Sequence, residues 1–214
     1  MNKKISIFLH NLCTYTQEGI KHLQPELHCD SGCNITIKPF GVDTHTVLNN
    51  NDENIFILGL HGYSNSHVGS LEFIMNWLPI CHHEVRVIII AKTNSIGNLK
   101  NYLLGLKNVY AVLDHATALH EFRIHLQNAI MDSPGSSPRK PTISPLTNQE
   151  LNVLKYLLKG MPVTMVADKL CIHYKTVSSH KRSALNKLGV NSLHRLMKCG
   201  NDTSIMNELL RNKI

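Results

Sequence analysis

The stretch KTVSSHKRSALNKLGV, residues 175–190, decides the fold of the C-terminal part of the chain. At 3.6 residues per turn its apolar side chains share one face, which comprises Val177, Ala184, Leu185 and Leu188. The opposite face carries cations and small polar groups at steps of four, three and four residues, namely Lys175, Ser179, Arg182 and Asn186. We therefore predict an amphipathic helix with a basic outer face, ended by Gly189.

Two further helices are predicted before this stretch. Residues 147–150, TNQE, form a capping-box sequence in front of a leucine stripe, and Gly160 ends that helix. Pro162 suits the first turn of the next helix, and residues 171–173 leave only a short turn before the basic helix. Two helices joined by a three-residue turn are typical of a helix-turn-helix, whose second helix enters the major groove of DNA.

The positive charge of the chain is confined to this region. The 214 residues carry a net charge of +7. Residues 1–138 contain nine Lys or Arg against eleven Asp or Glu, a balance of −2, whereas residues 139–198 contain eleven against two, a balance of +9. A localised excess of cations is typical of a surface that binds a polyanion such as double-stranded DNA.

Residues 145–200 resemble the four-helix DNA-binding domain of the LuxR/NarL family. The resemblance lies in LT-x-x-E at residues 146–150, L-x-x-G at residues 157–160, and TV-x-x-H-x-x-x-x-x-x-KLGV from Thr176. Within the family the stretch is most similar to the enterobacterial capsule-synthesis regulators of the Rcs type. One position departs from the family, which commonly has Lys or a similar long residue where this chain has Ser178. The operator preference of relatives therefore does not carry over.

The resemblance implies three groups of site residues. The base-reading positions are Ser178, Ser179 and Arg182. Arginine can donate two hydrogen bonds to guanine, and short serines let the helix lie deep in the groove. The DNA backbone contacts are Lys175, Thr176, Lys181 and Lys187, which supply affinity more than specificity. A fourth helix, capped by Asn191 or Ser192, would mediate dimerisation through Leu193, Leu196 and Met197.

The N-terminal part has a different pattern. Five short β-branched runs (residues 4–10, 34–40, 54–60, 85–91 and 109–113) alternate with polar or helical stretches. This rhythm predicts an α/β domain with a doubly wound, parallel five-stranded sheet of flavodoxin-like order. Residues 131–147 then contain four of the eight prolines. We place the N-terminal domain at residues 1–131, a linker at 132–146, the helix-turn-helix domain at 147–200 and a tail at 201–214.

The N-terminal domain resembles a response-regulator receiver that lacks its chemistry. A receiver needs acidic residues after the first strand, a phosphate-accepting Asp at the end of the third, a hydroxyl after the fourth and a Lys after the fifth. Aligned on the strands, this chain has His10 and Asn11, Gly59, Ala91 and Asp114 at those places. Without a carboxylate nucleophile or an oxygen cage for Mg²⁺, we expect a pseudo-receiver that is not phosphorylated at the usual site.

Other groups of histidines and cysteines do not have the spacing of a metal or redox site. Fourteen histidines include clusters at residues 61–67 and 81–83, but neither has the paired spacing of a structural zinc site. Cys29 and Cys33 lie in a polar loop outside a strand-helix context, and we expect reduced thiols throughout. No apolar run is long enough to cross a bilayer and no signal peptide is evident, which favours the cytoplasm. We assign no catalytic residue, metal or cofactor.

These observations favour a bacterial sequence-specific transcription regulator, an activator by our reading, and not an enzyme. The resemblance implies a homodimer, or a heterodimer with a receiver-containing LuxR-type regulator, acting on capsule or other surface-structure genes, with RNA polymerase a further candidate partner. Two alternatives stay open. One is a regulator whose N-terminal domain senses a small molecule, although the low aromatic content argues against an acyl-homoserine lactone domain. The other is a purely protein-binding regulator that never touches DNA.

Overall fold

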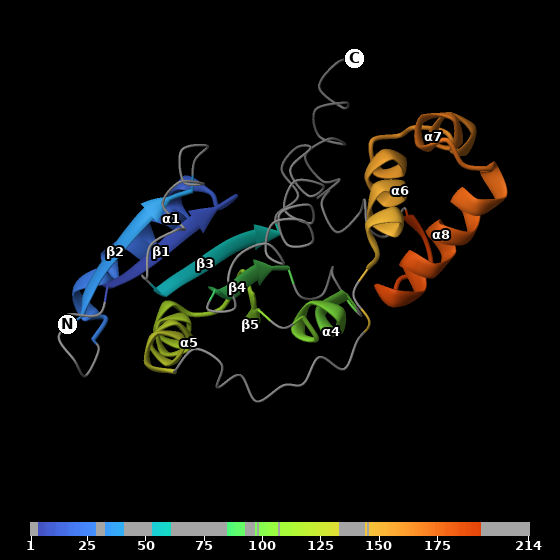
Figure 1. Ribbon diagram of the computed structural model, residues 1–214. Coiled ribbons are helices and arrows are strands. Elements are labelled where there is room, and N and C mark those ends of the chain that lie inside the picture. Colours follow the sequence, from blue (N-terminus) through green and yellow to red (C-terminus); the bar gives the residue numbers. More distant parts are fainter. Residues whose placement is uncertain are drawn as a thin grey trace, which may run out of the picture.

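The N-terminal part folds as an α/β unit around one parallel sheet. The computed structural model describes residues 4–28, 33–40, 53–60, 85–92, 97, 99–106, 108–132, 144 and 146–193. The five strands are β1 (Lys4–His10), β2 (Asn34–Pro39), β3 (Glu53–Leu60), β4 (Val85–Ala91) and β5 (Val109–Asp114). They pair in the order β2-β1-β3-β4-β5 with every neighbouring pair parallel (Figure 1). This is the flavodoxin-like order expected from the sequence.

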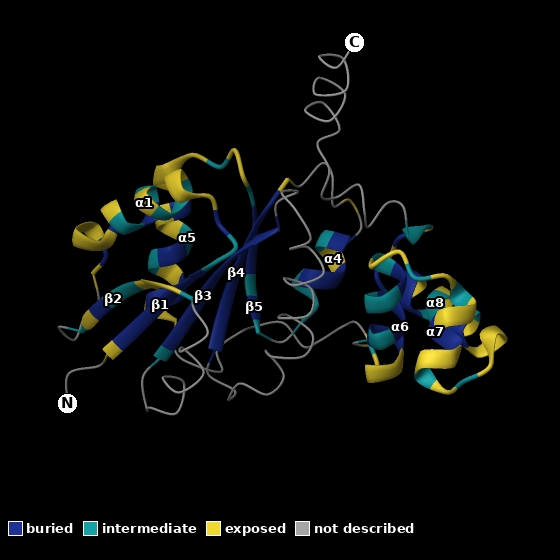
Figure 2. Ribbon diagram, turned by 90° about the horizontal axis from the view of Figure 1, so that it is seen from above, coloured by how far each residue is buried: buried dark blue, intermediate teal, exposed yellow. Residues whose placement is uncertain are grey.

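Helices cover both faces of the sheet, which explains why the central strands are mostly apolar. The helices of this part are α1 (Thr14–His22), the short 3₁₀ helix η1 (Gln24–Glu26), α4 (Leu99–Leu104) and α5 (Leu119–Met131). Successive strand residues point to opposite faces. Ile55 and Ile57 pack in a cluster with α1 and α5, whereas Phe56 and Leu58 pack in a cluster with α4. The dark strands in Figure 2 show this two-sided burial.

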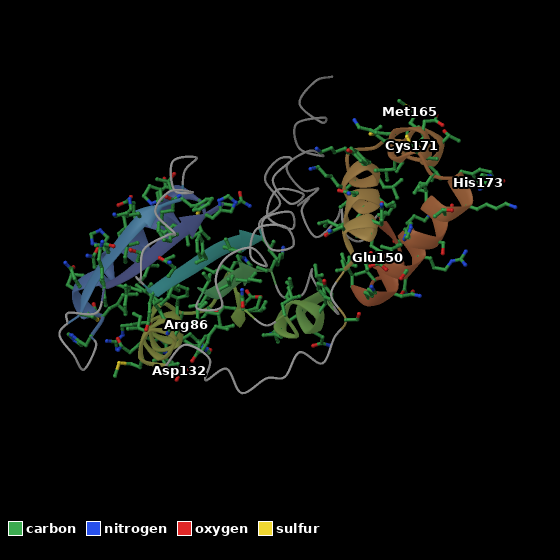
Figure 3. All side chains as sticks on the ribbon, in the orientation of Figure 1. Arg86, Asp132, Glu150, Met165, Cys171 and His173 are labelled. Carbon is green, nitrogen blue, oxygen red and sulfur yellow. The ribbon has the colours of Figure 1, made fainter. Side chains whose placement is uncertain are left out.

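A buried arginine holds the C-terminal end of α5 against the sheet. Arg86 on β4 donates hydrogen bonds to the carbonyl oxygens of Ala129 and Asp132, the latter at 2.8 Å, and pairs with Glu53. The Tyr110 hydroxyl donates to the Asp132 carboxylate at 2.8 Å. Burial and this acidic partner raise the pKa of Tyr110 to about 12. These bonds satisfy carbonyl groups at the end of α5, and Figure 3 shows Arg86 and Asp132 close together there.

The C-terminal part is helical. It consists of α6 (Asn148–Leu158), α7 (Val163–Leu170) and α8 (Tyr174–Lys187), so the fold class predicted for both parts is confirmed. The fourth predicted helix, beyond Leu193, and most of the predicted linker lie outside the described residues. The linker and the domain boundaries therefore stay predictions.

One expectation about cysteines was wrong. We expected reduced thiols, but Cys33 is disulfide-bonded in the structure. Among the described cysteines, Cys13 and Cys171 are free. The absence of a repeated cysteine spacing argued only against a disulfide framework. One isolated disulfide needs only two sulfur atoms within bonding reach of each other. The spacing of cysteines along the sequence does not exclude this.

Candidate nucleic-acid interface

Helix α8 is anchored to the rest of the C-terminal part by its apolar face. Val177, Ala184, Leu185 and Leu188 are at most 8% exposed, and Val177 packs with Val153 and Leu157 of α6 and with Val166 of α7. These are the four apolar residues that the helical period placed on one face. The opposite face of α8 is therefore turned away from its own core.

The outer face of α8 carries the predicted DNA-contacting residues. Lys175, Thr176, Ser179, Arg182 and Asn186 are exposed. Ser178 and Lys181 are half-buried at the flank of that face. The structure thus places the three predicted base-reading residues on one side of one helix, with Lys175 exposed in its first turn.

The turn before α8 adopts a left-handed conformation at a residue other than glycine. Cys171, which follows α7, has φ 52° and ψ 42°, a conformation that favours glycine. The amide of Ile172 donates to the carbonyl oxygen of Ala167 at 3.0 Å, which closes the end of α7. His173 then caps α8, since its Nδ1 accepts a hydrogen bond from the amide of Lys175 at 3.3 Å. Figure 3 shows Cys171 and His173 on either side of the turn between α7 and α8.

A buried carboxylate connects α6 to α8. The Thr147 side chain and Glu150 form the predicted capping box at the start of α6. Glu150 also accepts a hydrogen bond from the Ser183 hydroxyl at 2.6 Å and one from the Lys187 ammonium at 2.8 Å. Burial alone would raise the pKa of Glu150, but these donors together with Thr147 outweigh it and lower the pKa to about 2. The capping residue therefore also positions the outer helix (Figure 3).

Lys187 differs from the other residues predicted to contact the DNA backbone, because it also forms an ion pair within the protein. Its side chain is 23% exposed and forms an ion pair with Glu150. An ammonium carries three N–H donors, so this pair does not by itself exclude a contact with a phosphate. No sequence signal pointed to the pair, because Glu150 and Lys187 are 37 residues apart.

The N-terminal unit contacts the C-terminal part beside the start of α6. The amide of Leu146 donates to the hydroxyl of Tyr102 on α4 at 3.2 Å. Tyr102 is 2% exposed and belongs to one apolar cluster with Leu154 and Leu185 of the C-terminal part. Burial raises the pKa of the Tyr102 hydroxyl. This contact leaves the outer face of α8 exposed.

The predicted dimerisation residues are only partly visible. Leu193 is half-buried and packs against the apolar clusters of its own chain. Leu196 and Met197 lie outside the described residues.

Within the described ranges, the structure gathers no three His, Cys, Asp or Glu side chains in a geometry that could hold a metal ion. Over the same residues, no helix has the length and apolar character needed to cross a membrane.

Backbone atoms of Asn11 fill the space beside Gly59, near the end of β3. A Cβ atom added at Gly59, the position aligned with the receiver Asp, would lie 2.1 Å from the carbonyl oxygen of Asn11. Asn11 itself has φ 54°, and its side-chain amide donates to the Gly59 carbonyl oxygen at 2.8 Å. At the end of β5, Asp114 pairs with His115 at 3.1 Å and accepts a hydrogen bond from the amide of Ala116.

Comparison with known proteins matches the C-terminal part at the level of sequence. Residues 144–199 match the model of the bacterial regulatory proteins of the luxR family. The Fimbriae Z protein of Escherichia coli K12 is 39% identical over 61 residues, which is 28% of this chain and 29% of that protein. The DNA-binding transcriptional activator EvgA of the same strain is 30% identical over 89 residues, 42% of this chain and 43% of EvgA. The matched segments thus span less than half of these relatives.

The whole chain is similar in fold to a solved response regulator. RcsB of Salmonella enterica serovar Typhimurium, bound to promoter rprA, aligns with a TM-score of 0.50 over 94% of this chain and 98% of that one. The identity is 18%, so the likeness concerns the fold. The capping box, the turn, the outer face of α8 and the family match all fall within one segment. Residues 144–199 are therefore similar in sequence to the luxR family of bacterial regulatory proteins.

Proposed function

We propose that this chain is a sequence-specific transcription regulator that binds double-stranded DNA through α8. The observation that supports this most is the outer face of α8, where Ser179 and Arg182 are exposed beside half-buried Ser178. A helix held by its apolar face, with short hydroxyls and one long cation outward, suits insertion into the major groove. Ser178, Ser179 and Arg182 would read bases. Lys175, Thr176, Lys181 and Lys187 would contact phosphates and fix the register.

We further propose that aspartyl phosphorylation at the usual receiver position does not control the regulator. Two features support this proposal. The end of β3 has Gly59 instead of an acceptor carboxylate, and the Asn11 backbone occupies the space that a side chain at this position would need. Phosphoryl transfer to a receiver requires a carboxylate nucleophile and oxygen ligands for Mg²⁺. The N-terminal unit would then serve packing and association.

The regulator would act as a homodimer, or as a heterodimer with a phosphorylatable regulator of the same family. Leu193, Leu196 and Met197 are the candidate contacts for such a dimer. An activating role on capsule or other surface-structure genes fits two of the relatives, one named as a fimbriae protein and one as a transcriptional activator. RNA polymerase would then be a further partner. A DNA target of this kind places the regulator in the bacterial cytoplasm, and a catalytic activity is not part of the proposal.

Among the described residues, the hollow beside α1 and η1 does not favour the ligand-sensing alternative. A hollow of about 360 Å³ is lined by Lys21, Gln24, Pro25, Leu27, Cys33 and Ile35. Small-molecule sites are typically enclosed and mostly apolar, whereas this hollow is a shallow depression with polar walls.

DNA binding by the purified chain, alone and mixed with a phosphorylatable regulator of the same family, tests the proposal. A homodimer predicts tight, salt-dependent binding of the chain alone to a palindromic site. A heterodimer predicts weak binding alone and tight binding of the mixture to an asymmetric site. Treatment of the chain alone with acetyl phosphate should leave its mass and its affinity unchanged. Equal affinity for every duplex, alone and in the mixture, would contradict sequence-specific binding.

A further inference from the structure

An exposed aromatic side chain stands at the start of the DNA-reading helix. Tyr174 is the first residue of α8, and 50% of it is exposed. Within the described residues of the C-terminal part, the other large apolar side chain this exposed is Met165 of α7, at 53%. Neither residue was assigned a role from the sequence. Tyr174 differs from Met165 because it lies on the same helix as the predicted base-reading residues.

The ring of Tyr174 is held in place before any ligand arrives. It lies against the ring of His173, with centroids 4.4 Å apart and planes inclined by 38°. His173 is in turn fixed by its hydrogen bond from the amide of Lys175. A side chain that is already ordered loses less conformational entropy when it binds a partner. The aromatic ring is therefore preorganised at the tip of α8.

Helical geometry directs this ring to the same groove as the base-reading residues. Tyr174 precedes Ser178 by four residues and Arg182 by eight, so the three lie along one side of the helix. Side chains on a helix tilt toward its N-terminus, and recognition helices contact base edges mainly with their N-terminal residues. The ring thus lies beyond Ser178 on the side of α8 that carries the base-reading residues. It is at the N-terminal end of the helix, which would enter the groove most deeply.

We propose that Tyr174 is an additional specificity-determining residue, whose ring packs against the C5 methyl group of a thymine in the major groove. This inference rests on the proposed function, since it requires α8 to lie in that groove. The thymine methyl is the apolar group that the major groove presents, and apolar side chains read it by contact. The thymine would lie next to the base pairs that Ser178 contacts, at one edge of each half-site.

Replacement of single thymines by uracil in the selected site tests the contact, because uracil lacks only the methyl group. The wild-type chain should lose affinity about fourfold at one thymine per half-site, the loss expected for one buried methyl group. Tyr174→Ala should lose a similar factor on thymine DNA and should no longer respond to uracil. Tyr174→Phe should keep both the affinity and the response. Met165→Ala, with an equally exposed side chain on α7, should behave as wild type.

Two results would overturn this assignment. The first is a wild-type chain that binds a selected site but does not respond to uracil at any position. The second is a Tyr174→Phe chain that loses affinity equally on all sequences, which would make the hydroxyl a phosphate contact. Failure of the proposed function looks different, because the wild-type chain would then select no site and Arg182→Ala would change nothing. Thermal unfolding of each variant shows that a lost response is not lost folding.

Discussion

The Lys187 ammonium lies 2.8 Å from the Glu150 carboxylate and joins the last turn of α8 to the first turn of α6. The same carboxylate accepts a hydrogen bond from Ser183 and closes the capping box with Thr147. One buried side chain therefore links α8 to the start of α6. The amide of Leu146, one residue before the cap, bonds to Tyr102 of the N-terminal unit. The contact between the two parts and the support of α8 thus meet at the start of α6.

Replacing the carboxylate by an amide tests this support. Glu150→Gln keeps the shape but removes the charge that Lys187 and Ser183 bind. We expect the free energy of unfolding in urea to fall by about 2 to 3 kcal/mol, since hydrogen bonds to a buried charged group contribute about this much. Glu18→Gln removes an exposed carboxylate that pairs with Lys21 at 2.7 Å, and it should leave stability almost unchanged because water screens exposed ion pairs. Equal losses in the two variants would refute the role of burial.

The stability contributed by Glu150 should depend on pH. Its pKa is about 2 in the folded chain, below the ordinary value of 4.5 for a glutamate. Because folding lowers the pKa, the contribution is fully present above about pH 4.5 and is lost as the pH falls toward 2. The difference in unfolding free energy between wild type and Glu150→Gln should therefore be constant near neutral pH and narrow between pH 4.5 and 2.5. A difference that stayed constant down to pH 2.5 would show that the carboxylate is not stabilised in this way.

Arg182 should contribute to the recognition of one base pair. Arg182→Ala is expected to cost about 1 to 3 kcal/mol on the selected site and to relax the preference at one position. Lys159→Ala removes the same charge from an exposed residue at the end of α6 and should leave every base preference intact. Competition between specific and random duplexes measures both variants. If Arg182→Ala reduced the affinity for all duplexes by the same factor, Arg182 would be a phosphate contact and not a base-reading residue.

Lys181 and Lys187 should separate affinity from stability. Each phosphate contact removed should reduce the slope of log affinity against log salt by about 0.9. Lys181→Ala is expected to flatten this slope with little change in unfolding, whereas Lys187→Ala should flatten the slope and also lower stability, because it leaves Glu150 without its cation. Binding titrations at several salt concentrations measure the slope. If Lys187→Ala left the salt dependence of binding unchanged, Lys187 would pair with Glu150 and would not contact a phosphate.

The closed position at Gly59 predicts a strong cost for any side chain. Gly59→Ala should lower the free energy of unfolding by about 1 to 3 kcal/mol, because the new Cβ would meet the Asn11 carbonyl oxygen at 2.1 Å. Gly19→Ala is the matched control, since nothing lies within 4 Å of a Cβ there, and in α1 it should raise stability by about 0.5 to 1 kcal/mol. Gly59→Asp should likewise be destabilised and should gain no phosphoryl group from acetyl phosphate. Phosphorylation of Gly59→Asp would show that the site is intact apart from its acceptor.

The elements that the sequence predicts well are those whose pattern is set by burial alone. The runs at residues 54–60 and 85–91 are mostly apolar because both faces of the central strands are covered, and they appear as β3 and β4. The two faces of α8 follow in the same way from a 3.6-residue period. In both cases the signal lies within a few neighbouring residues.

The features that the sequence did not reveal depend on contacts between distant segments. Glu150 was recognised as a capping residue but not as the partner of Ser183 and Lys187, which are 33 and 37 residues away. The closure at Gly59 arises from Asn11, 48 residues earlier. The residues that neighbour each of these positions in the sequence do not predict either contact. Tyr174 could have been found from its position, since it lies four residues before Ser178 on a helix already predicted to read DNA.

Selection from random duplexes by the wild-type chain and by Arg182→Ala tests the central claim most directly. We predict that the wild-type chain enriches one sequence motif and that Arg182→Ala enriches the same motif with one position relaxed. Recovery of no motif by the wild-type chain, alone or with a regulator of the same family, would contradict sequence-specific binding. Recovery of an identical motif by both chains would contradict the assignment of base reading to the outer face of α8.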